Sequence, residues 1–161
     1  MPEMTVLGWF HTILGILAVL SGFYTLYKYK IITTEESSGK LYVLVTLLVA
    51  GSALGIYNQG GFGIAHVLAV LTLIALAGGY SMEKFKWFGS FSKYFQALGY
   101  TTTLLFHMIP AITDFLRRLP VGDPFIDSFE DSLLLNFHTA FLVIYLFGLV
   151  AQIVWLKRQA D

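Results

Sequence analysis

The chain has 161 residues, contains no cysteine, and has a charged fraction of only 12%. Without cysteine there can be no disulfide, no thiolate metal site and no thiol nucleophile, so His, Asp, Glu and Met remain as candidate metal ligands. The few charges also balance, because ten basic residues stand against ten acidic ones. A balanced chain has no overall field that would attract nucleic acid, so only the positions of individual charges carry information.

Other signals are missing as well. The sequence contains no nucleophile elbow, zincin motif or phosphate-binding loop, so nothing in it indicates hydrolase chemistry, and whether the protein is an enzyme stays open. The start MPEMTVLGWFH has no basic region of the kind that precedes a cleaved signal peptide. The apolar run that follows is long enough to span a bilayer, so we expect the first helix to be retained.

Hydrophobic residues, in contrast, are abundant. They make up 57% of the chain, and the mean hydropathy is +0.72, which lies outside the range of soluble domains. The apolar residues fall into five long runs separated by polar or turn-forming segments. We therefore predict an all-α, polytopic membrane helix bundle, a single transmembrane domain over residues 1–161, with helices at about 5–27, 41–57, 62–80, 95–116 and 133–156.

The basic residues predict an orientation. Three lysines follow the first run and three follow the third, while the chain start and the connection after the second run carry none. Two arginines follow the fourth run, and Lys157 and Arg158 close the fifth. Eight of the ten basic residues therefore fall on one side. By the positive-inside rule, the N terminus is outside and the C terminus is cytoplasmic.

Every histidine lies in one of the predicted membrane helices, and the four are His11, His66, His107 and His138. Each stands roughly 21 to 28 Å from the cytoplasmic end of its helix, at about 1.5 Å per residue, so we expect all four at a similar depth in the outer leaflet. Neutral imidazoles at one depth can converge on a haem iron or a metal ion. Alternatively, each could simply hydrogen-bond to a neighbouring helix.

The fourth run carries further polar residues near its outer end. Asp114 follows His107 by two helical turns, and Arg117 and Arg118 come next. Asp114 could relay protons, could orient a histidine that binds a ligand, or could pair with one of the arginines, and we favour the ion pair. The arginines could instead neutralise haem propionates or lipid phosphates.

Helical spacing predicts which faces of these helices point inward. Tyr100, Thr103, His107, Ala111 and Asp114 form one stripe, and His138, Leu142, Tyr145, Leu149 and Gln152 form another. His11 is followed by the small residues Gly15, Ala18 and Gly22, which would permit the close approach of another helix or of a flat cofactor. We expect at least two of the four histidines to meet at a shared level inside the bundle.

Much of the chain resembles a known family. The resemblance lies in HTILGILAVLSGF, in GKLYVLVTLLVAGSALGIY and in YTTTLLFHMIPAITDFLRRLPVGDPF, through residues such as His11, Tyr42, His107, Asp114 and Arg118. These segments resemble the DUF2306-type family of uncharacterised bacterial membrane proteins. The resemblance implies a multi-pass protein of the bacterial inner membrane and implies no particular activity.

Three functional hypotheses follow. The first is a redox or electron-transfer protein that binds haem b, our first choice, or a metal ion through His11, His66, His107 and His138, supported by Asp114, Arg117 and Arg118. The second is a cofactor-free accessory subunit of a larger respiratory or transport complex, or of a homo-oligomer, held by its glycine-lined faces. The third is a quinol or proton-coupled site at His107 and Asp114, which requires a polar cavity.

Overall fold

The computed structural model describes residues 4–57 and 61–160, and all regular structure within them is helical. This confirms the predicted all-α class. The elements in chain order are α1 (Val6–Tyr29), α2 (Ser37–Ala53), α3 (Ile64–Phe85), the 3-10 turn η1 (Gly89–Phe91), α4 (Ser92–Arg118) and α5 (Ser132–Ala160).

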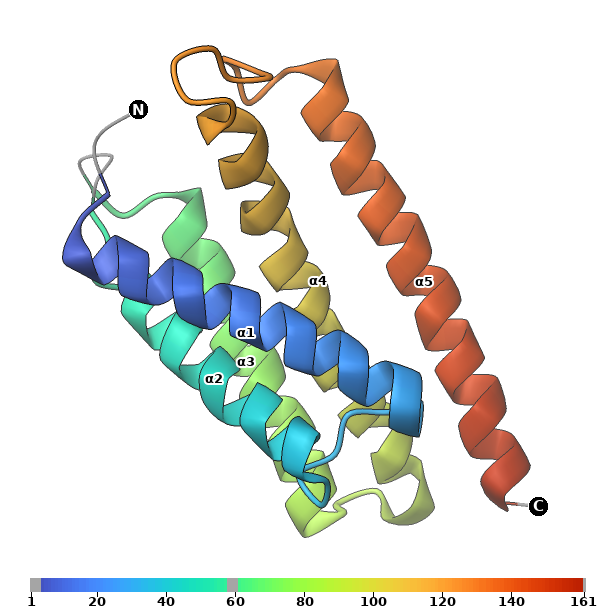
Figure 1. The fold of residues 1–161 in the computed structure, drawn as a ribbon. Helices are drawn as coiled ribbons and strands as arrows, with labels where there is room; N and C mark the ends of the chain where they lie inside the picture. Colours follow the sequence, from blue (N-terminus) through green and yellow to red (C-terminus); the bar gives the residue numbers. More distant parts are fainter. Residues whose placement is uncertain (1–3, 58–60, 161) are drawn as a thin grey trace.

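Successive helices run in opposite directions (Figure 1). The chain start, the α2–α3 loop and the α4–α5 loop lie at one end, which we call the acidic end because the α4–α5 loop carries Asp123, Asp127, Glu130 and Asp131. The α1–α2 and α3–α4 connections and the C terminus lie at the other, which we call the basic end after lysines such as Lys30, Lys86 and Lys157.

The bounds of α2 and α3 differ clearly from the predicted ones, and α5 ends at Ala160 rather than 156. α2 begins at Ser37 rather than 41 and ends at Ala53 rather than 57. Its first turn contains Gly39, which packs directly on the backbone of Thr33, a close contact that only glycine allows. α3 continues to Phe85 rather than ending at 80. Glu83, one of the two charged residues in this extension, is hydrogen-bonded to neighbouring segments, so a polar extension of the helix is stable there.

The core lies between α1, α2, α3 and α4, toward the basic end. Tyr42 of α2 and Tyr100 of α4 are fully buried, and together with Ala18, Val45 and Leu104 they belong to one hydrophobic cluster. The helices approach closely at glycines. A Cβ on Gly99 would lie 2.8 Å from the carbonyl oxygen of Ala75 in α3, so any side chain at this position would push α3 and α4 apart.

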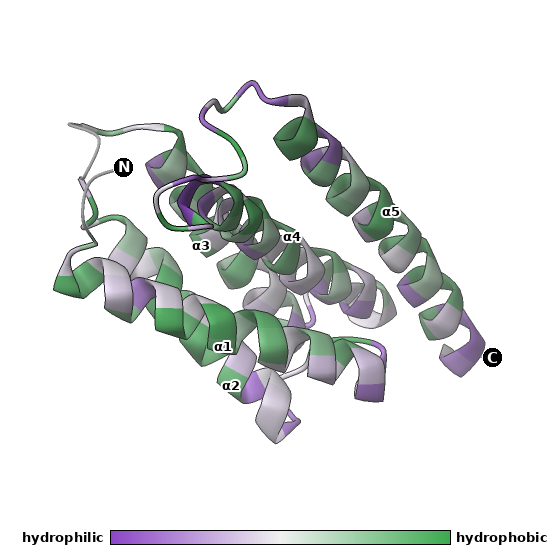
Figure 2. Cartoon of the chain, turned by 45° about the horizontal axis from the view of Figure 1, so that its top comes forward, coloured by the Kyte–Doolittle hydropathy of each residue, from purple (hydrophilic) through white to green (hydrophobic). Residues whose placement is uncertain are grey.

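α5 packs on α4 along the polar stripe that its sequence predicts. The hydroxyl of Tyr145 lies 2.7 Å from that of Thr102, and Thr101 donates a hydrogen bond of 3.0 Å to Gln152. The remaining surface of α5 is mostly apolar and exposed, as the green outer faces of the helices in Figure 2 show. Hydrophilic residues gather in the connections and at the C terminus (Figure 2).

Three of the helices, α1, α3 and α5, are long and apolar enough to cross a membrane. α2 is also apolar but has only 17 residues. α4 is long but polar along one face, where Gln96, Thr103 and His107 are buried against the other helices. By length and composition, α1, α3 and α5 therefore qualify as membrane spans, and α2 and α4 do not.

Candidate functional site

A cavity of about 560 Å³ lies between α1, α2, α3 and α4, in the half of the bundle nearer the acidic end. Its walls are predominantly apolar. Small side chains create much of the space, because six of the residues that line it are Gly or Ala: Gly15, Ala50, Ala53, Ala65, Ala69 and Ala111. No other atom would lie within 4 Å of a Cβ placed on Gly15. The small residues of α1 therefore have two different surroundings. Ala18 and Gly22 pack in the core, and Gly15 faces the cavity.

His11 lines the cavity from α1 and is held by α2. Its Nδ1 lies 3.1 Å from the carbonyl oxygen of Val49 and 3.2 Å from the hydroxyl oxygen of Ser52. Within the described residues, no polar group bonds to its Nε2. One ring nitrogen is thus fixed by the protein, and the other is available to a ligand.

His107 lines the same cavity from α4 and is buried, with 7% of its surface exposed. Its Nε2 lies 3.0 Å from the hydroxyl of Thr46 in α2, and its ring packs edge-on against Tyr42, with ring centres 6.3 Å apart. Tyr42 in turn lies 2.6 Å from the hydroxyl of Thr103. The predicted inward face of α4 is confirmed from Tyr100 to His107, where Tyr100 and Thr103 are fully buried, whereas Ala111 and Asp114 further along the stripe are exposed at the cavity.

Asp114 and Arg118 line the end of the cavity nearest the α4–α5 loop. The Nε of Arg118 lies 3.4 Å from Asp114 Oδ2, one helical turn away, so the ion pair that we favoured from the sequence is confirmed with this arginine. The other predicted arginine, Arg117, points elsewhere and stacks on the ring of Phe129 at 3.8 Å. Only one of the two arginines therefore belongs to the cavity.

His66 is buried at the start of α3 but does not line this cavity. Its Nδ1 accepts a hydrogen bond of 3.1 Å from the backbone N–H of Gly63, which satisfies an otherwise free amide at the helix start. The ring lies between Tyr57 and Phe62, at centre distances of 4.7 and 5.0 Å. This environment gives His66 a helix-capping role.

His138 is also separate from the cavity. It faces α4 from α5, and its Nε2 lies 3.3 Å from the hydroxyl of Thr113. The structure therefore brings His11 and His107 together at one cavity, and it places His66 and His138 elsewhere. Across residues 4–57 and 61–160, no group of three or more His, Asp or Glu side chains is arranged to hold a metal ion.

Sequence reasoning missed the residues that hold the two cavity histidines. Thr46 and Ser52 are the polar residues of α2 after Tyr42, and both face the rest of the bundle. The signal was present, because Thr46 follows Tyr42 by four residues and so shares its helical face. The spacing of these residues therefore indicates a polar stripe on α2, like those on α4 and α5.

A polar network at the basic end was also missed. Glu83 Oε1 accepts hydrogen bonds from the hydroxyl of Thr33 at 2.7 Å and from the backbone N–H of Thr34 at 2.6 Å. Its Oε2 accepts one of 2.7 Å from the hydroxyl of Tyr100. The side-chain amide of Gln96 donates to the carbonyl of Ile32 at 2.9 Å. This network ties the α1–α2 connection to α3 and α4.

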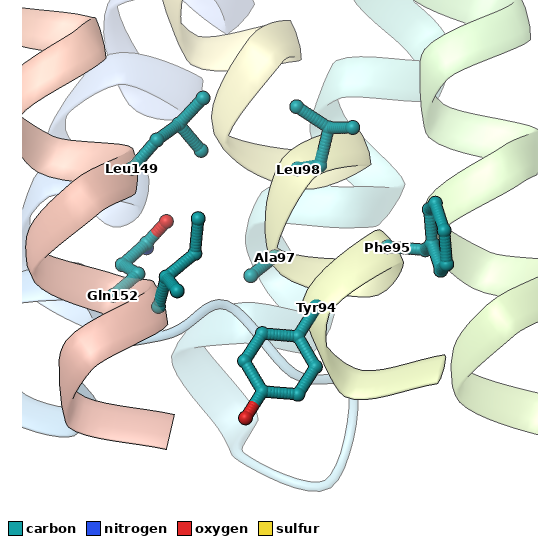
Figure 3. A pocket seen from close by; sticks show the side chains of 7 residues that line it. Tyr94, Phe95, Ala97, Leu98, Leu149 and Gln152 are labelled. Atoms are coloured by element: carbon teal, nitrogen blue, oxygen red, sulfur yellow. The ribbon is translucent and has the colours of Figure 1, made fainter. Parts of the chain in front are cut away.

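A second, smaller cavity of about 150 Å³ lies between α4 and α5 near the basic end. Figure 3 shows Ala97 and Leu98 of α4 opposite Leu149 and Gln152 of α5. The Gln152 amide is already engaged at both ends, accepting from Thr101 and donating 3.0 Å to the carbonyl of Lys30. This cavity therefore offers a ligand little beyond apolar contact.

The chain matches no known family model, no curated protein and no solved structure. The DUF2306-type resemblance therefore stays a prediction, and the argument for function rests on the geometry of the larger cavity.

Proposed function

We propose that the chain is a five-span protein of the bacterial inner membrane and that its larger cavity binds a quinone or quinol. α2 and α4, which do not meet the length and composition criteria for a membrane span, are also compatible with a membrane. The 17 residues of α2 rise about 26 Å, close to the roughly 30 Å of a hydrocarbon core. The buried polar residues of α4, among them Gln96, Thr103 and His107, face its neighbours, where they do not meet lipid. A DUF2306-type identity agrees with this location.

The charge distribution supports an orientation with the basic end in the cytoplasm. The α1–α2 and α3–α4 connections, the helix turns that adjoin them and the end of α5 all lie at that end and together carry eight of the ten basic residues. The N terminus and the cavity then belong to the outer side. A reporter fused to the C terminus should be active only in the cytoplasm, and activity in the periplasm would contradict this orientation.

The observation that carries the ligand proposal is the cavity itself, whose walls are mostly apolar and whose ionisable side chains are those of His11, His107, Asp114 and Arg118. Its volume lies within the usual range of small-molecule sites, and its few polar groups can orient a head group. A ligand that reaches it from the bilayer must itself be apolar. An isoprenoid quinone joins an apolar tail to a ring with two polar oxygens, which is the combination that these walls accommodate.

Trp9 provides a way to test this proposal, because it lines the cavity whereas Trp87 lies in the connection after α3, at the basic end. In a variant that retains Trp9 alone, a short-chain quinone should quench the fluorescence in a saturable manner. A variant that retains Trp87 alone is the matched control and should show only the weak, linear quenching of random collisions. Equal, unsaturable quenching in both variants would contradict the proposal.

One specific observation favours haem as a second candidate. Histidines that bind metals usually donate one ring N–H to a carbonyl and bind the metal with the other nitrogen, and His11 is held at Nδ1 in this way. His107 differs in that a hydroxyl, that of Thr46, holds its Nε2, which leaves its Nδ1 for a ligand. Titration of the purified protein with haem b should then give a Soret band that His11→Ala removes, whereas an unchanged spectrum would reject haem.

Both candidate ligands carry electrons, so either would give the protein a role in electron transfer. A sample that binds neither quinone nor haem, and that copurifies in fixed proportion with a larger complex, would instead favour the accessory-subunit hypothesis.

A further inference from the structure

The hydrogen bonds of His11 determine which of its ring nitrogens carries the proton. The carbonyl oxygen of Val49, 3.1 Å from Nδ1, can only accept a hydrogen bond. The hydroxyl of Ser52 donates its own proton to that same carbonyl at 2.9 Å, so its oxygen is also left to accept from Nδ1. The Val49 carbonyl therefore requires a proton on Nδ1, and the Ser52 hydroxyl, when it donates to that carbonyl, is compatible with one.

A neutral imidazole with its proton on Nδ1 has a lone pair on Nε2. The surroundings favour the neutral form, because the walls are mostly apolar and the carboxylate that lines the cavity, Asp114, is paired with Arg118. The cavity therefore presents a hydrogen-bond acceptor at His11, for which the described part of the chain supplies no donor.

We propose that the cavity selects a ligand that presents a hydroxyl group to His11 Nε2, and so binds the quinol form in preference to the quinone. This inference rests on the proposed function and adds the identity of the bound form. A quinone carries only carbonyl oxygens at its ring, and two acceptors placed together repel each other and leave both without a donor. A quinol O–H donates to the Nε2 lone pair.

Two ligands that do not undergo redox chemistry separate the effect of the hydroxyl from that of the ring. A 4-alkylphenol and its methyl ether share the ring, the oxygen and the tail, but only the phenol has a proton to donate. Binding of each to the detergent-solubilised protein is measured by calorimetry. We expect the phenol to bind roughly five- to tenfold more tightly, the factor that corresponds to one hydrogen bond.

Two variants assign the preference to His11. In His11→Phe, a ring of similar shape remains but it has no nitrogen lone pair, so the preference should disappear. Ser52→Ala removes one of the two acceptors at Nδ1 and leaves the Val49 carbonyl in place, so the preference should remain.

The outcomes separate this inference from the proposed function. Equal affinities in the unmodified protein, tighter binding of the ether, or a preference that survives in His11→Phe would each overturn the inference while leaving a ligand-binding cavity. If neither compound binds and neither competes with a short-chain quinone, the proposed function fails as well.

Discussion

The two halves of this bundle use the same kinds of residue differently. Toward the basic end, glycine allows close helix contact, as at Gly99, and the Glu83 carboxylate is hydrogen-bonded at both oxygens. Toward the acidic end, Gly15 faces open space and His11 keeps one ring nitrogen without a partner among the described residues. One half is closely packed, and its buried polar groups are mostly bonded within the chain, with the hydroxyl of Thr34 as an exception, whereas the other, the hollow half, contains the larger cavity and retains free hydrogen-bonding capacity.

This difference shows that residue type alone does not separate structure from function in an apolar bundle. A buried polar group whose partners are all supplied by the protein stabilises the fold. A polar group that lines a cavity with a free donor or acceptor can serve a ligand instead. Variants in the packed half should therefore reduce stability, and variants in the hollow half should mainly alter binding.

The largest loss of stability is expected from Glu83→Ala. This change removes the acceptors of three hydrogen bonds, including one from the backbone N–H of Thr34, and should lower the free energy of unfolding by about 3 kcal/mol. Thermal denaturation in detergent measures the effect. Glu130→Ala, in the exposed α4–α5 loop, is the matched control and should change little. Equal stability of the two variants would mean that the hydrogen bonds of Glu83 do not stabilise the fold.

A smaller loss is expected from Gly99→Ala. The new Cβ would lie 2.8 Å from backbone atoms of α3, which cannot move independently of their helix, so we expect a loss of about 2 kcal/mol. The same substitution at Gly148 of α5, where a Cβ meets no other atom within 4 Å, should be neutral or slightly stabilising. If Gly99→Ala were as stable as Gly148→Ala, the packed half would not be as tight as described.

Thr46→Val should have the smallest effect on stability of the three. Valine has the shape of threonine, but it leaves His107 Nε2 without its partner, and we expect a loss of about 1 kcal/mol. Thr139→Val is the control, because that hydroxyl is exposed and bonds only to its own helix. If the Thr46→Val protein had the same melting temperature as the unmodified protein, the bond between Thr46 and His107 would contribute nothing to stability.

Sequence patterns predicted the all-α class and the inward face of α4, because helical spacing fixes which side chains share a face. They also predicted the Asp114–Arg118 pair, which is a local contact within one helix. The basic residues predict an orientation that still awaits the reporter experiment.

Contacts between distant segments were not predictable in the same way. The bonds from His11 to Val49 and from Glu83 to Thr34 join residues 38 and 49 positions apart, and they depend on how the helices are rotated and offset. The cavity depends on more than one residue as well. It exists because several small side chains from different helices face the same point, which no single stripe reveals.

The most direct test of the central claim, that the hollow half is a ligand site, is to fill it. Gly15→Leu places a side chain in the cavity without meeting a neighbouring atom at Cβ, and Gly148→Leu makes the same change on α5, away from the cavity. Equilibrium binding of a short-chain quinone should be at least tenfold weaker in Gly15→Leu and unchanged in Gly148→Leu. Unchanged affinity in a folded Gly15→Leu protein would contradict the claim.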